Sequence, residues 1–345
     1  MAYRFKLDEP ISKGFKRIAR EHISRALNEL GEGDVAADAV HESRKTIKRL
    51  RALLRLVRPE IAEKAFKARS AGLRNAGHML SGQRESKVLS DTIAKLEAQF
   101  GEDGARILTP FKLAAANALR ASNTTLDKDA ATTLRALLET EGRRLEKLKL
   151  RKDGLQVLAT GLAQSYGKGR RALAKAYKSP SDVHFHDLRK TVQWHWRHMA
   201  LLSRAWPEYF EVRINAAREL SQLLGDDHDL AMLQLTAEDL HKTESTDFAP
   251  VIRLARARQE ELRADCFERA RRLFAERPED FVRRIEIYWS AGQRVKPLQG
   301  PIDQDAADFE PPCEPHSEAQ PAPVASSAPR LTVAKRDNVP SQRRA

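Results

Sequence analysis

Two segments of the chain carry histidine, arginine and lysine at the same spacing. The first is His41-Glu-Ser-Arg44-Lys45, and the second, 145 positions later, is His186-Asp-Leu-Arg189-Lys190. Arg, Lys and protonated His donate charge-assisted hydrogen bonds to phosphate and carboxylate oxygens. This chemistry indicates binding of an anion.

Both segments fit one side of a helix, because successive residues of an α-helix are about 100° apart. Like charges four residues apart repel on a helix, and acidic residues are nearly absent from both stripes. Two such stripes predict two helices that jointly present positive charge to one anion. The first stripe contains His41, Arg44, Lys45, Lys48, Arg51 and Arg55, and the second contains His186, Arg189, Lys190, Gln193, Arg197 and Arg204.

The overall charge supports a polyanionic partner. The 345 residues include 61 Lys and Arg against 48 Asp and Glu, a formal net charge of +13. The positive charge is concentrated before Pro297, because the last segment holds slightly more acids than bases. The sequence therefore predicts a nucleic acid, an anionic membrane surface or a phosphate polymer as partner.

Cysteine content and hydropathy indicate a cytoplasmic protein. The two cysteines, Cys266 and Cys313, cannot form a disulfide framework and fit a reducing compartment. No apolar run is long enough to span a membrane, and the first residues lack the apolar stretch of a signal peptide.

Apolar residues recur every three or four positions through most of the chain, which predicts an all-α fold. Residues 297–345 hold nine of the sixteen prolines, and we expect this tail to be disordered. The repeated segments favour an internal duplication: two pseudo-symmetric four-helix bundles, residues 1–150 and 151–296, flanking a basic groove. Leu80-Ser-Gly-Gln-Arg84-Glu85 matches Leu224-Gly-Asp-Asp-His228-Asp229 at nearly the same offset.

These motifs resemble the CHAD family, whose name stands for conserved histidine α-helical domain. The duplicated His-x-x-Arg-Lys and the later Leu-Gly-x-x-(Arg/His)-Asp carry the resemblance, over roughly residues 3–295. It implies two four-helix bundles around a basic groove or tunnel that binds inorganic polyphosphate, at polyphosphate granules. The ligand residues that it implies here are His41, Arg44, Lys45, Lys48 and Arg51, with His186, Arg189, Lys190 and Arg197.

Four further positions complete the predicted site. Arg55 continues the first stripe, Arg84 and His228 occupy matching places in the duplicated Leu-Gly segments, and Arg170 belongs to a basic segment that we expect along the same groove. Gln193 stands where the first repeat has Lys48, and Trp196 stands where it has Arg51. We therefore expect the first half to be the stronger anion site.

The run Asp226-Asp-His-Asp229 leaves two interpretations open. Oxygen-rich clusters bind Mg²⁺ or Ca²⁺, although the defined loop spacing of such sites is absent here. We favour a role in orienting Arg and His side chains. Trp194 and Trp196 are about 160° apart on a helix and cannot form one base-stacking platform, so we expect them to pack between helices.

The sequence thus predicts a non-catalytic polyphosphate-binding protein, without cofactor or metal, at cytoplasmic polyphosphate granules. Two alternatives remain open. One is a nucleic-acid-binding protein, for which no recognition motif is present beyond the charge that allows non-specific binding. The other is a phosphate-anhydride hydrolase with a metal at Asp226–Asp229. The tail could bind granule proteins.

Overall fold

The structure is a computed structural model that describes residues 3–31, 35, 37–80, 85–120, 128–243 and 246–295. Within these ranges every regular element is a helix. The all-α prediction is confirmed for this part of the chain. The tail predicted to be disordered, residues 297–345, lies outside the described residues.

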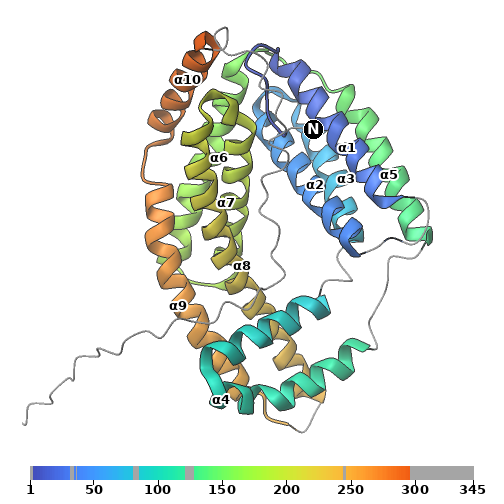
Figure 1. Cartoon of the computed structure of the whole chain (residues 1–345), viewed down its shortest axis with the longest axis vertical. Helices are drawn as coiled ribbons and strands as arrows, with labels where there is room; N and C mark the ends of the chain where they lie inside the picture. Colours follow the sequence, from blue (N-terminus) through green and yellow to red (C-terminus); the bar gives the residue numbers. More distant parts are fainter. Residues whose placement is uncertain are drawn as a thin grey trace, which may run out of the picture. The chain divides into compact units, whose positions relative to one another are not determined.

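Four helices from the first half of the chain pack in a ring (Figure 1). The helix α1 contacts α2 and α5, and α3 contacts the same two helices. The 3-10 turn η1 follows α2. The bounds are α1 (Ile11–Leu30), α2 (Ala37–Leu56), η1 (Arg58–Glu60), α3 (Glu63–Met79) and α5 (Lys128–Glu146).

Helices from the second half form the other group. The helix α7 packs between α6 and α8, α10 covers α6, and α9 runs along α8. The turn η3 joins α7 to α8. The bounds are α6 (Leu155–Lys178), α7 (Asp182–Leu202), η3 (Ser203–Ala205), α8 (Pro207–Thr243), α9 (Ala249–Leu273) and α10 (Pro278–Val295).

The helix α4 (Glu85–Arg120) departs from a simple division into halves. It follows α3 in sequence but packs against α8 and α9 (Figure 1). Gly101, with φ at 60°, breaks it into two segments. Both segments bury apolar residues in a separate cluster with α8 and α9. The pseudo-symmetric duplication stays a prediction.

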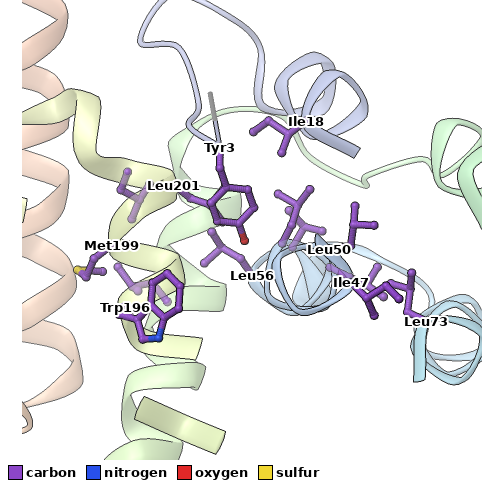
Figure 2. Close-up of a cluster of buried hydrophobic side chains, with 14 of the residues drawn as sticks. Tyr3, Ile18, Ile47, Leu50, Leu56, Leu73, Trp196, Met199 and Leu201 are labelled. Carbon is purple, nitrogen blue, oxygen red and sulfur yellow. The ribbon is translucent and has the colours of Figure 1, made fainter. Parts of the chain in front are cut away.

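One hydrophobic core joins the two groups of helices. It contains residues from α1, α2, α3 and α5 together with residues from α6, α7, α8 and α10. In Figure 2, Trp196, Met199 and Leu201 of α7 lie in the same cluster as Tyr3 and α2 side chains. The Phe5 backbone N–H donates to the Leu201 carbonyl at 2.9 Å, so the segment before α1 is anchored on α7. The predicted boundary near residue 150 is not tested by this packing.

None of the described helices combines the length and apolarity needed to cross a membrane.

Candidate functional site

The two predicted stripes lie on α2 and α7, and their apolar sides are buried. Ile47, Leu50 and Leu53 of α2 are at most 2% exposed, as are Phe185 and Leu188 of α7. Burial of these residues turns the cationic side of each helix away from the core. The apolar sides of both helices are buried as expected, whereas Arg197 of the second stripe is itself only 6% exposed.

The first half of α2 carries four of the predicted ligands, all half-buried: His41, Arg44, Lys45 and Lys48. Arg44 donates through Nη1 to the carbonyl of Leu80, directly after α3. The Lys45 ammonium pairs with Glu42 of its own helix at 2.9 Å. These two contacts hold the cations close to the helix surface.

Two arginines crowd the end of α2. Burial lowers the pKa of Arg51, and the neighbouring charge of Arg74 on α3 lowers it further. Burial also lowers the pKa of Arg55 to about 10, with the charges of Arg58 and Arg51 adding to the effect. Both groups still carry their charge at neutral pH. The shifts come mainly from burial, and the smaller contribution of neighbouring charges indicates that positive groups lie close together here.

Close backbone packing brings α6 to this end of α2. A Cβ atom at Gly161 would lie 1.6 Å from the carbonyl oxygen of Leu56, so only glycine fits this crossing. Lys168 is seven residues further along α6 and therefore on the same side of the helix. Burial lowers the pKa of Lys168, and the charges of Arg55 and Lys190 lower it further. Lys168 thus links the α2 cations to those of α7.

On α7, His186 faces His228 of α8. Their ring centroids are 4.5 Å apart with an interplanar angle of 35°. Burial lowers both pKa values, that of His228 to about 4, and the charges of Arg189 and Lys190 add to the effect. A Cβ at Gly225 would lie 3.3 Å from Arg189 Nη2, so the glycine lets this guanidinium rest on α8.

These groups form a series of basic residues across the two sequence repeats. Each member either lowers the pKa of a neighbouring member or has its own pKa lowered by a neighbouring member. Two carboxylates pair with members of the series, Glu63 with Arg58 at 3.0 Å and Asp187 with Lys190 at 2.7 Å. We call the series the basic track; it comprises Arg74, Arg51, Arg55, Arg58, Lys168, Lys190, Arg189, His186 and His228.

The sequence from α1 to α8 identifies the family. A model of the CHAD domain matches residues 17–238, which include both stripes and His228. The chain belongs to the CHAD family. The predicted resemblance is confirmed.

Two solved structures are similar to this CHAD protein. PptA from Streptomyces chartreusis is 14% identical, with a TM-score of 0.50, and the match covers 77% of this chain and 96% of PptA. The CHAD domain from the plant Ricinus communis is 18% identical, with a TM-score of 0.50, over 84% of this chain and 95% of that domain. At these identities the similarity shows the fold alone. No curated protein matches the sequence.

Four predicted ligands in the first half of α2 lie outside the basic track, and their ligand roles stay predictions: His41, Arg44, Lys45 and Lys48. Three further predicted ligands of this CHAD protein do not join the track either. Arg197 is only 6% exposed, and its Nη1 donates to the backbone carbonyl of Gln193 at 2.9 Å. Arg170 is two residues from Lys168 and therefore about 200° around α6. Arg84 lies outside the described residues. The ligand roles of all three stay predictions, and the geometry does not favour those of Arg197 and Arg170.

The acidic run orients cations within the described part of the chain. Asp227 is 2% exposed and accepts from Arg263 Nε at 2.5 Å, while Asp226 pairs with Lys95 of α4 at 2.8 Å. Burial raises the pKa of Asp227, and Arg263 opposes this shift. Asp226 also lines a cavity of about 300 Å³ between α4, α8 and α9, which no residue of the basic track lines.

Sequence reasoning missed four residues of this region. Arg58, Arg74 and Lys168 belong to the basic track, and Trp194 of α7 lies under Arg55, whose Cζ is 3.7 Å from the ring centroid. Lys168 belongs to the same basic segment from which Arg170 was predicted as a ligand. Which side of α6 faces α2 depends on the contact at Gly161, and this places Lys168 near the α2 cations. Trp194 was expected to pack between helices, and its partners here include cations.

Proposed function

We propose that the basic track binds inorganic polyphosphate without catalysis. The observation that carries the proposal is the meeting of α2, α6 and α7 at Trp194, where the Arg55 Cζ lies 3.7 Å and the Lys168 Nζ 5.1 Å from the indole centroid. Arg55 from the first repeat and Lys190 from the second both act on Lys168. A polyanion could therefore meet cations of both repeats along one path.

The chemistry of the track suits a linear phosphate polymer. Arg can give forked hydrogen bonds to phosphate oxygens, whereas Lys acts as a point charge. A polymer with a charge on each repeating unit should also gain affinity from the release of bound counterions. The CHAD resemblance implies the same ligand. Binding would bring the protein to polyphosphate granules.

The non-catalytic assignment rests on where the carboxylates lie. Glu63 and Asp187 each pair with one cation of the track, and Asp182, whose charge acts on His228, pairs with Arg263. Asp227 is paired with Arg263 and buried. We therefore expect no release of orthophosphate from polyphosphate or nucleoside triphosphates when Mg²⁺ is supplied. Turnover abolished by Asp226→Asn or Asp229→Asn would overturn this assignment.

Calorimetry with two charge-matched double variants tests the binding site. Arg51→Gln with Arg55→Gln removes two track cations, and we expect at least about tenfold weaker binding of long-chain polyphosphate, or about 1.4 kcal/mol. Arg106→Gln with Arg143→Gln removes the same charge from surface positions of α4 and α5. This control should bind within about twofold of the wild type, since distant exposed charges are screened. Equal losses in the two variants would show that net charge, not the track, governs binding.

A further inference from the structure

Aromatic rings alternate with cations at the centre of the basic track. The Cζ of Arg58 is 4.6 Å from the Phe66 centroid, and the Cζ of Arg55 is 5.9 Å from the same ring. Arg55 also lies 3.7 Å over Trp194, and the Lys168 Nζ is 5.1 Å from that indole. We call this series the cation–aromatic ladder; it comprises Arg58, Phe66, Arg55, Trp194 and Lys168.

The ladder joins elements that are far apart in sequence. Phe66 belongs to α3, Arg55 to α2, Trp194 to α7 and Lys168 to α6. Phe66 is fixed by the core, at 7% exposure, whereas Trp194 is half-buried. The indole is thus the part of the ladder that connects the α2 cation to the α6 cation.

A ring stabilises a cation differently from a carboxylate. The ring quadrupole attracts the positive group but carries no net charge, so the field of the cation remains available to a polyanion. A carboxylate in the same place would cancel that field and would have to be displaced on binding. Stacking also fixes the planar guanidinium before the ligand arrives, which reduces the entropy lost when the complex forms.

The repulsion inside the track explains why such support is needed. The charges of Arg58 and Arg51 act on Arg55, and those of Arg55 and Lys190 act on Lys168. Without the indole, the flexible Arg55 and Lys168 side chains would be free to swing apart into solvent. The track would then lose its continuity at the junction of the two repeats.

We propose that Trp194 is a positioning residue for polyanion binding, which holds Arg55 and Lys168 together where the track passes from the first repeat to the second. This inference rests on the proposed function. The indole arranges the two cations and does not itself contact phosphate.

The test is a double-mutant cycle measured by calorimetry with long-chain polyphosphate. Trp194→Leu should weaken binding about fivefold, the equivalent of about 1 kcal/mol. Trp194→Phe keeps a ring face and should bind within about twofold of the wild type. In the background of Arg55→Gln with Lys168→Gln, Trp194→Leu should have no further effect, because the cations that it positions are gone.

The control is Trp206→Leu, which removes a more exposed indole, at 46% exposure, from a site packed against Tyr209 and Tyr288. It should leave the affinity unchanged. Circular dichroism and melting temperature identify any variant that is not folded. If Trp194→Leu is not folded, the affinity of Trp194→Phe is compared with that of Lys168→Met, which removes one cation without altering the ring.

Two results would overturn the inference. One is wild-type affinity in a folded Trp194→Leu protein. The other is a further fivefold loss from Trp194→Leu in the variant that lacks both cations, which would mean direct contact or a purely structural role. Failure of the proposed function is distinct, since the wild-type protein itself would then not bind polyphosphate.

Discussion

The neighbouring rings of His186 and His228 are the groups through which we expect the basic track to respond to pH. In the free protein burial lowers both pKa values, and Arg189 and Lys190 lower them further, against the opposing charges of Asp187 and Asp182. Both rings are therefore neutral near pH 7. Phosphate oxygens beside them would favour the protonated forms, so binding should take up protons.

Polyphosphate affinity should consequently rise as the pH falls from about 7 toward 5. The rise should level off below about pH 4, where His228 becomes protonated in the free protein as well. Titrations across this range measure the effect, with His186→Gln and His228→Gln combined as the control. We expect a flatter profile for this control. An unchanged pH dependence would assign the titration to other groups.

Individual side chains were predicted unevenly from the sequence. Helical periodicity placed Arg51, Arg55 and Arg189 correctly on the cationic sides of their helices. The same periodicity placed Arg197 on its stripe, yet its guanidinium folds back onto Trp196, 4.0 Å from the centroid, and onto its own helix backbone. Spacing cannot reveal such local contacts. Lys168 belongs to the track because of the tertiary contact between α6 and α2 at Gly161, which no local sequence pattern encodes.

At the scale of helices, the crossing of α2 and α6 determines whether the two stripes meet. Gly161→Ala would place a Cβ against the Leu56 carbonyl, and backbone cannot yield as a flexible side chain can. We expect a loss of stability of about 2 kcal/mol or more. We also expect weaker polyphosphate binding, because α6 must shift away from α2. Urea unfolding and calorimetry measure the two effects.

Gly77→Ala is the matched control, since the nearest atom to a Cβ at this position of α3 is 3.8 Å away. Alanine is the better helix former, so this variant should be as stable as the wild type or more stable by about 0.5–1 kcal/mol. If both alanine variants behaved alike, the close crossing would not control the assembly of the track.

The helices themselves were predicted well, because their apolar spacing is local information. The placement of α4 was not. Its apolar residues, such as Ile93 and Phe111, would serve equally in either half of the chain. Its burial against α8 and α9 depends on which surface remains available after α1, α2, α3 and α5 close on one another. Sequence periodicity shows that a face is buried but not which helix covers it.

At the scale of the whole molecule, one hydrophobic core holds both sequence repeats in place. His198 of α7 bonds through Nε2 to the carbonyl of Ala52 on α2 at 3.0 Å, and Tyr3 donates to the carbonyl of Arg49 at 2.7 Å. These contacts fix the two stripes relative to each other. A ligand that spans both should therefore bind more tightly than one that reaches a single stripe, since its second contact forms at high effective concentration.

Competition for the protein by phosphate compounds of different size tests this claim most directly. Labelled long-chain polyphosphate would be displaced, at about 150 mM salt, by unlabelled long chains, pyrophosphate or single-stranded DNA at matched phosphate concentration. We predict that the long chains compete at least tenfold better than either, by about 1.4 kcal/mol or more. Equal competition by pyrophosphate would indicate a small phosphate pocket, and equal competition by DNA would indicate a nucleic-acid-binding protein; either result would contradict a track built for polyphosphate.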